Sequence, residues 1–356
     1  MYSGKIIIDI GHPAQVHQFK NIYWELKEKG YEILFTAKRK EITQYLLRQY
    51  NLQFESMGQP RKGLVKKILY IHTSCFRFYK IVKQFKPNLV LSRFSFHATW
   101  VSSLLKIPHI GFTDTEHVIL ADKLTVPFVN TKLTAYSYQK DLGKNHIRYS
   151  GNIEMFYLHP KRFKPDKTIL KHLGVNDGEK YIIMRFIAWD AHHDIGQNGL
   201  TVDMKIKAVK QMAKLAKIFI TSEKDIPSEL EQYRINVPPE KIHDALYFSS
   251  MYFGEGATMA SESALLGVPA VYINSLTAGS IEELQENKLL YRFMDGKEAI
   301  GKAIELLKQD KEVNKLNLKK FLNDKIDVTA FIVWFIQNYP ESRDLLKSNP
   351  SYQEKF

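Results

Sequence analysis

The sequence predicts an α/β protein with two domains, each built on a parallel β-sheet that helices cover on both faces. Three observations support this fold class. The chain has 356 residues, which is long for a single hydrophobic core. Short apolar segments alternate with helical segments, which is the pattern of parallel strands joined by crossover helices. The alternation is interrupted at 151–167, a segment with two prolines and mixed charge that we interpret as an interdomain linker.

The first half begins with the buried strand KIIIDI, and the helix that follows ends at Gly30, a residue suited to a helix C-terminus. The same alternation continues up to the linker. The expected strands are 5–10, 31–37, 52–57, 88–94, 109–114, 132–136 and 146–151, and the expected helices are 14–29, 40–49, 62–85 and 96–106.

After the linker the pattern restarts with the strand KYIIMRFIA. The expected strands are 180–188, 217–222, 251–255 and 269–274, with helices around 202–215, 227–233 and 240–249, a helix after 255, and helices within 297–323. We expect the apolar segment 328–339 to form a further helix near the end of the chain. We therefore expect Rossmann-like domains at 1–160 and 161–325, followed by a helical segment, 326–356, that packs back toward the first domain.

The composition favours an anionic partner, because 51 lysines and arginines outnumber 38 aspartates and glutamates and give a formal net charge of +13. A soluble basic protein without such a partner would have the same composition. We expect no nucleic-acid partner, because the chain lacks zinc-ligand spacing, an aromatic RNA-binding signature and a basic zipper. The single cysteine, Cys75, and the absence of a long apolar segment predict a cytoplasmic location.

The stretch GEGATMASESALLGVPAV, residues 254–271, combines a small-residue loop with a helix start at the end of an expected strand. Ligands of open α/β sheets bind at the carboxyl ends of the strands, and free amides at a helix start favour phosphate. The predicted diphosphate-binding amides belong to Gly256, Ala257, Thr258 and Met259. Glu262, one turn further, is placed to accept hydrogen bonds from ribose hydroxyls. A tight turn with a solvated Glu262 is the alternative interpretation.

This stretch resembles the C-terminal nucleotide-sugar motif of GT-B glycosyltransferases. It is similar to that of the UDP-N-acetylglucosamine 2-epimerases and of the lipid-linked muramyl-peptide GlcNAc transferase. Glu262 falls on their ribose-binding glutamate, and Gly267-Val268-Pro269 on their G-x-P. Other stretches resemble the domain of unknown function 354 family of predicted glycosyltransferases. These are DIGHPAQVHQFKN, GFTDTEH, RFIAWDAHHDIGQNGL and PPEKIHDALYFSS.

The resemblance covers about residues 5–340 and implies a GT-B-like fold, in which two Rossmann-like domains face a cleft. It implies that the first domain binds the acceptor. The loops after two of its strands then supply the candidate catalytic residues His12, His17, Asp114 and Glu116, one of which would remove the acceptor proton. Histidines that pack in the core or cap a helix, and a polar loop around Asp114, are the alternatives.

The second domain would bind the nucleotide sugar, with Arg185 against the diphosphate and Ser222, Glu223 and His243 near the nucleoside. Alternatively, Arg185 forms a structural ion pair, and Ser222, Glu223 and His243 cap helices. The run His192-His193-Asp194 suggests a metal, but adjacent residues of an extended segment point to opposite faces. We therefore expect neither a metal site nor a cofactor.

Residues 61–86 form a basic, aromatic segment at helical spacing. We expect its apolar side chains to pack on the sheet; they are Leu64, Ile68, Ile71, Phe78 and Val82. Its lysines and arginines are suited to an anionic membrane at the inner face, which would fit a lipid-linked acceptor. A solvated helix face is the alternative.

Together these features predict a metal-independent glycosyltransferase that moves a sugar from a UDP-linked nucleotide sugar to a cell-envelope or polysaccharide acceptor. Two other functions stay open. One is an epimerase of the UDP-N-acetylglucosamine 2-epimerase type, which needs no acceptor. The other is a protein that binds a nucleotide sugar without catalysis.

Overall fold

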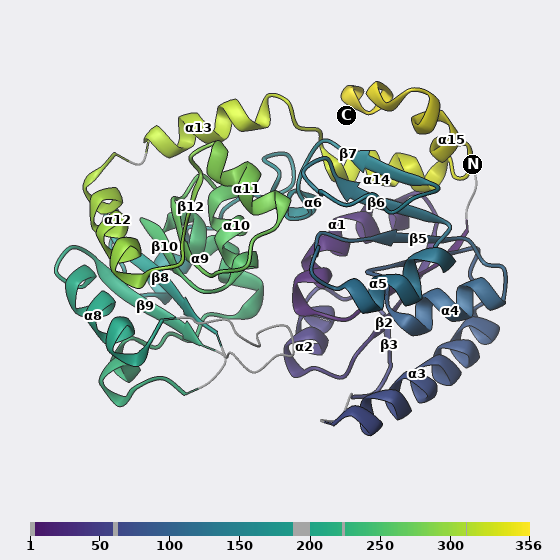
Figure 1. The fold of residues 1–356 in the computed structure, drawn as a ribbon, viewed down its shortest axis with the longest axis horizontal. Coiled ribbons are helices and arrows are strands. Elements are labelled where there is room, and N and C mark those ends of the chain that lie inside the picture. The colour runs from purple at the N-terminus through teal and green to yellow at the C-terminus, as the bar shows by residue number, and fades with distance from the viewer. Residues whose placement is uncertain (1–3, 60–62, 188–199, 223–224, 311) are drawn as a thin grey trace. The chain divides into compact units, whose positions relative to one another are not determined.

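The computed structural model describes residues 4–59, 63–187, 200–222, 225–310 and 312–356. The chain divides into two compact units (Figure 1). Unit 1 comprises Met1–Arg162 and Lys325–Phe356, and unit 2 comprises Phe163–Asp324. Each unit is an α/β structure around one parallel sheet, so the predicted fold class is confirmed.

Unit 1 contains a seven-stranded sheet of order β3-β2-β1-β4-β5-β6-β7. Its strands are β1 (Lys5–Ile10), β2 (Glu32–Ala37), β3 (Phe54–Ser56), β4 (Leu89–Ser92), β5 (His109–Phe112), β6 (Thr131–Ala135) and β7 (His146–Tyr149). The strand order reverses between β1 and β4, which is where open α/β sheets bind their ligands.

The helices of unit 1 pack on both faces of this sheet. They are α1 (Pro13–Glu28), α2 (Glu41–Gln49), α3 (Leu64–Phe85), α4 (Phe96–Leu104), α5 (Ile119–Thr125), η1 (Val126–Phe128), α6 (Met155–Leu158), α14 (Val328–Gln337), α15 (Glu341–Ser348) and η4 (Pro350–Lys355). On one face, Ile7 and Val90 pack with Phe78 and Val82 of α3. The C-terminal α14 packs against α1 and α6.

Among its described side chains, helix α3 differs from its prediction at Ile68, while the burial of Leu64 lies outside what the structure describes. Phe78 and Val82 are buried, as expected, whereas Ile68 is 48% exposed. The expectation that Ile68 packs on the sheet is therefore wrong. The buried residues of α3 in this core, Phe78 and Val82, come from the second half of the helix, whereas Ile68 lies in the first half. No helix within the described ranges is long and apolar enough to span a bilayer.

Unit 2 contains a five-stranded sheet of order β12-β11-β10-β8-β9. Its strands are β8 (Tyr181–Phe186), β9 (Lys217–Ser222), β10 (Met251–Gly254), β11 (Ala270–Ile273) and β12 (Leu290–Phe293). Its helices are α7 (Thr168–His172), α8 (Val202–Met212), η2 (Ser228–Tyr233), η3 (Pro239–Lys241), α9 (Ile242–Phe248), α10 (Ala257–Leu265), α11 (Gly279–Glu286), α12 (Gly296–Lys308) and α13 (Glu312–Leu322).

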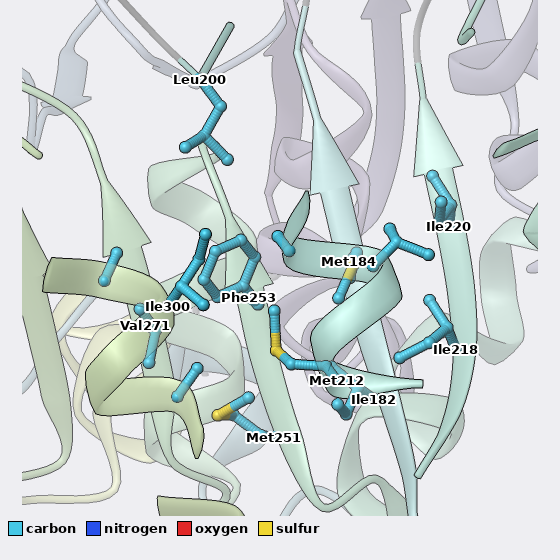
Figure 2. Packing of buried hydrophobic residues seen from close by; sticks show 14 of the residues in the cluster. Ile182, Met184, Leu200, Met212, Ile218, Ile220, Met251, Phe253, Val271 and Ile300 are labelled. Atoms are coloured by element: carbon cyan, nitrogen blue, oxygen red, sulfur yellow. The ribbon is translucent and has the colours of Figure 1, made fainter. Parts of the chain in front are cut away.

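Alternation along the strands of unit 2 creates two different faces. Met184 and Phe253 pack with Met212 of α8 and Ile300 of α12 in the core shown in Figure 2. The intervening residues point to the opposite face. There the Tyr181 hydroxyl donates to the carbonyl oxygen of Ala245 in α9, at 2.6 Å. Helix α9 and its neighbour α10 therefore lie on the sheet face opposite to α8 and α12, which we call the α9–α10 face.

The sequence pattern did not predict every element. Strand β12 and helix α11 lie in a segment that was not assigned, because the four-residue LYRF has no clear alternation and three of its side chains are only half-buried. The segment predicted as a helix at 227–233 is the 3₁₀ helix η2, which Pro227 precedes. Short helical segments often adopt the tighter 3₁₀ form, in which hydrogen bonds join residues three apart.

Candidate functional site

The N-terminus of α10 lies directly after β10, the central strand of unit 2. Gly256 is the N-cap residue, and no side chain of the described ranges caps the helix. The Tyr252 hydroxyl holds the loop, because it donates to the Gly256 carbonyl at 3.0 Å and accepts from the Gly256 amide at 3.2 Å. Ala257 and Thr258 are exposed, and the first amides of α10 donate to no capping side chain among the described residues.

Glu262 lies one turn into α10, and it is buried rather than solvated. Its Oε1 lies 3.0 Å from Nε2 of His243, which is also buried and comes from α9. The structure thus brings together two of the predicted nucleotide-binding residues. A buried carboxylate next to a buried imidazole forms a polar pair that a ligand hydroxyl can join.

Arg185 lies on β8 beside the same loop. It pairs with Gly254 across the sheet, and its Cγ would lie 3.4 Å from a Cβ placed on Gly256. Burial raises the pKa of the Tyr252 hydroxyl, and the Arg185 guanidinium opposes that rise. Arg185 therefore belongs to the α9–α10 face and lies near the start of α10, as a diphosphate-binding role requires.

Glu255 is a residue of this loop that the sequence prediction missed. It is fully buried, and its carboxylate accepts from the Ile187 amide at 3.1 Å and the Leu200 amide at 2.7 Å. The Lys205 ammonium lies 3.4 Å away. The Glu255 carboxylate therefore bonds Ile187 and Leu200, the described residues on either side of segment 188–199. The available signal was a glutamate directly after a buried strand, between two glycines.

Two further predicted residues of unit 2 lie at or beyond the carboxyl end of β9. The Ser222 hydroxyl donates to the Phe186 carbonyl at 3.3 Å, so it links the ends of β9 and β8. Glu223 lies outside the described residues, as do His192, His193 and Asp194. Within the described ranges there is no group of three side chains arranged to hold a metal ion.

The two candidate histidines of unit 1 occupy different environments. His12 is the exposed N-cap of α1, and its Nδ1 accepts from the Ala14 amide at 3.3 Å. His17 is buried on α1, with Nδ1 3.3 Å from the Tyr50 hydroxyl and its ring 5.6 Å from that of Tyr157. The position of His17 is that of a packed core residue.

Asp114 follows β5 and forms an ion pair with Arg93, which follows the neighbouring strand β4. The Thr115 hydroxyl donates to the same carboxylate at 2.9 Å. About 31% of the Asp114 side chain stays exposed. Glu116 instead accepts from the Gln139 amide at 2.9 Å, so its carboxylate ties its loop to the segment after β6.

A buried polar cluster at the ends of β1 and β2 was also missed. Asp9 accepts from Thr36 at 2.7 Å and from Ser95 at 2.6 Å, and it lies 2.8 Å from Nε2 of His97. Burial by itself raises the pKa of Asp9, but His97 and the two hydroxyls outweigh that effect and hold the pKa below its ordinary value. The signal in the sequence was a charged residue inside the strand KIIIDI.

These features define an α/β protein of the GT-B-like class. The family model described as Protein of unknown function (DUF354) matches residues 4–340, so the chain belongs to that family, as its motifs indicated. An uncharacterized protein of Methanocaldococcus jannaschii is 27% identical over 277 residues, which cover 74% of this chain and 80% of that protein.

Solved structures share the same fold. A UDP-GlcNAc 2-epimerase from Neisseria meningitidis, bound to UDP-GlcNAc, matches with a TM-score of 0.63 and 12% identity over 88% of this chain and 94% of its own. A glycosyltransferase from Streptomyces sp. SF2575 matches with a TM-score of 0.59 and 13% identity over 94% of this chain and 100% of its own. The GT-B-like fold is thus shared with both kinds of enzyme.

Proposed function

We propose that this protein is a GT-B-type glycosyltransferase that moves a sugar from a UDP-linked nucleotide sugar to a cell-envelope or polysaccharide acceptor, without a bound metal. One observation carries the proposal. The uncapped N-terminus of α10 opens at the end of the central strand β10, with the buried Glu262–His243 pair one turn behind it. That arrangement suits a ligand with a diphosphate next to a ribose.

Unit 2 would bind the donor. The amides of Ala257, Thr258 and Met259 would meet the diphosphate, and the dipole of α10 would contribute roughly 0.3–1 kcal/mol at an exposed terminus. Arg185 would add a charge-assisted contact. Glu262, oriented by His243, would accept from a ribose hydroxyl. Ser222 would contact the nucleotide sugar at the edge of this site, beside β8.

Unit 1 would bind the acceptor, and Asp114 is the candidate base that its contacts favour. Arg93 and Thr115 orient its carboxylate while leaving part of it exposed. His12 accepts a helix amide through Nδ1, and His17 is buried against aromatic rings. We assign these two histidines to shaping and packing the acceptor loop.

The proposed reaction uses these residues as follows. Asp114 takes the proton of an acceptor hydroxyl, whose oxygen attacks the anomeric carbon of the sugar. The bond between that carbon and the diphosphate oxygen breaks, and UDP departs with the bonding electrons. The α10 amides and Arg185 stabilise the negative charge that develops on the diphosphate.

A peripheral membrane location follows from the same proposal. Helix α3 exposes Ile68, Leu69 and Phe76 among its lysines. Apolar side chains flanked by cations suit the surface of an anionic bilayer, where a lipid-linked acceptor would be presented.

An epimerase acting on a UDP-sugar is the second candidate. It is favoured by the fold match to a UDP-GlcNAc 2-epimerase over 88% of this chain. Incubation with UDP-sugars alone separates the two functions. Turnover that waits for an acceptor supports transfer, whereas a new epimer or free UDP without an acceptor supports the epimerase.

The donor site is tested by calorimetric titration with UDP. Glu262→Gln keeps the size of the side chain but removes its charge, and UDP affinity should fall about tenfold. Thr258→Asp places a carboxylate at the start of α10 and should also weaken UDP binding, while the neutral control Thr258→Asn should bind nearly as wild type. Equal affinity in all of these proteins would contradict the donor site.

A further inference from the structure

A second basic site lies in unit 1, at the β2–β3 edge of the sheet. A cavity of about 510 Å³ is lined by Arg39, Ser56, Gly58, Gln59 and Arg77. Arg39 follows β2, and Arg77 belongs to α3. Ser56, Gly58 and Gln59 lie at and after the end of β3. The cavity is therefore at the carboxyl ends of two parallel strands, where α/β sheets place their ligand sites.

The backbone around this cavity is held in place by hydrogen bonds. The Arg39 amide donates to the Gly58 carbonyl at 2.8 Å, and the Met57 amide donates to the Ala37 carbonyl at 2.8 Å. Gly58 has φ +79°, and Nη1 of Arg77 lies 2.5 Å from where its Cβ would stand. The glycine thus allows the guanidinium to lie against the loop backbone, which a larger residue would prevent.

The charged side chains that line the cavity are all positive. Both ionisable residues that line it are arginines, and no carboxylate lines it. Neither arginine has an ion-pair partner among the described residues, whereas Arg93 and Arg162 of the same unit pair with carboxylates. Two guanidinium groups beside a hydroxyl and an amide side chain supply donors for an anion with several oxygens.

A buried donor lies near the same guanidinium. The Tyr70 hydroxyl is buried and has no hydrogen-bond partner within the described ranges. Tyr70 precedes Arg77 by two turns on α3, so both point to the same face of the helix. Burial raises the pKa of Tyr70 to about 12, with Asp9 adding to the rise and Arg77 opposing it, so the hydroxyl keeps its proton at neutral pH.

We propose that this cavity binds a phosphate or diphosphate group, held by Arg39 and Arg77. A tetrahedral phosphate offers more acceptor oxygens than a carboxylate and can accept hydrogen bonds from both guanidinium groups at once. Identification of this group as part of the acceptor rests on the proposed function. Binding of the anion does not rest on it, because the cavity is formed within unit 1 alone.

The test is a titration of the full chain with inorganic pyrophosphate. Arg39→Gln combined with Arg77→Gln should weaken binding by at least about tenfold. Lys83→Gln, which removes an exposed cation from the same helix without touching the cavity, should change affinity less than about twofold. Gly58→Ala should also weaken binding, because it displaces the Arg77 guanidinium but keeps its charge. Unchanged melting temperatures of the glutamine variants establish that they fold.

Two controls separate this proposal from the donor site and identify the source of the anion. The titrations are repeated in Thr258→Asp, which weakens the diphosphate site proposed at the start of α10; the loss caused by the double variant should persist there, so failure of the donor site and failure of this site are distinguishable. Sedimentation with phosphatidylcholine vesicles that carry a polyprenyl diphosphate, but not with plain vesicles, would assign a lipid-linked ligand if the double variant loses it. Binding of pyrophosphate alone would assign a water-soluble ligand. Equal pyrophosphate affinity of the wild type and the double variant would overturn the proposal.

Discussion

At the scale of single residues, the environment of Asp114 is set by its neighbours in the fold. The sequence places it after a strand, but only the fold brings Arg93 from the adjacent strand to its carboxylate. An oriented and partly exposed carboxylate is what a general base requires, whereas Glu116 in the same loop is tied to the Gln139 amide. The two acidic residues of one loop therefore lie in different environments, and the proposed function assigns the base to Asp114.

Replacing Asp114 tests this difference. Asp114→Asn should lower kcat by roughly 10²- to 10⁴-fold with little change in UDP affinity, because the amide keeps the size of the side chain but cannot take a proton. Glu116→Gln, the matched control, should retain most of the activity. Steady-state kinetics with an acceptor measure both. An Asp114→Asn enzyme with normal kcat would remove Asp114 as the base.

His109 is a second residue whose environment determines its chemistry. It is fully buried on β5, its Nε2 lies 2.8 Å from the Ser92 hydroxyl, and burial lowers its pKa to about 3. An unfolded histidine has its pKa near 6.5, so between about pH 3 and 6.5 the unfolded chain binds a proton that the folded chain does not. Folded stability is therefore fully present above pH 6.5 and decreases as the pH falls.

Urea denaturation at several pH values measures this effect. Below pH 6.5, His109 should contribute a loss of up to about 1.4 kcal/mol per pH unit to the free energy of unfolding. His109→Gln should show a shallower decline over the same range, although the variant is less stable at neutral pH. Parallel pH profiles for the two proteins would contradict the assignment.

At the scale of elements, β10 and β8 approach closely because residue 254 has no side chain. A Cβ on Gly254 would lie 2.3 Å from the Arg185 carbonyl oxygen and 2.9 Å from the Arg185 nitrogen. Those atoms belong to the backbone of the neighbouring strand and cannot rotate away. The glycine therefore permits the strand pair that positions both Arg185 and the start of α10.

Gly254→Ala should destabilise unit 2 by about 3 kcal/mol or more, because the strands must separate to admit a methyl group. Gly301→Ala in α12 is the matched control. Nothing lies within 4 Å of a Cβ at that position. It should be neutral or stabilise by up to about 1 kcal/mol, because alanine favours the helix. Thermal denaturation measures both variants, and a similar effect of the two would contradict this reasoning.

The elements that periodicity predicted are those whose apolar residues alternate or repeat clearly. Strand 5–10 and strand 217–222 have the bounds that the sequence predicted. Strand β12 and helix α11 were missed because burial there depends on what packs beside them, rather than on a local pattern. The exposure of Ile68 on α3 was missed for the same reason.

At the scale of the whole molecule, the chain returns to unit 1 after completing unit 2. Phe331 and Phe335 of α14 are fully buried, and the Thr329 hydroxyl donates to the Phe156 carbonyl at 2.7 Å. The Arg162 guanidinium bonds Asp327, at 2.8–3.0 Å, and also pairs with Glu25 of α1. Unit 1 therefore depends on residues from both ends of the sequence.

Removing one of these charges should weaken unit 1 selectively. Asp327→Asn should cost about 1–3 kcal/mol, because Arg162 loses one of its two carboxylate partners in a partly buried site. The control Asp344→Asn breaks an exposed pair with Arg343 and should cost less than about 1 kcal/mol. Hydrogen exchange should report faster exchange in α1 and α14 but not in α8 and α12. Equal loss of protection in both units would contradict the division.

The sequence by itself determined the α/β class, the parallel sheets and the choice of 254–271 as a candidate binding stretch. Strand alternation, helix periodicity and glycine spacing are local properties of the chain and can be read from it directly. The tertiary structure decided which polar residues meet. The burial of Glu262 against His243, the pairing of Asp114 with Arg93, the cluster around Asp9 and the basic cavity at Arg39 and Arg77 all join segments that are distant in sequence. The physical reason is that burial and charge pairing depend on what packs across a sheet, and that is a property of the folded chain.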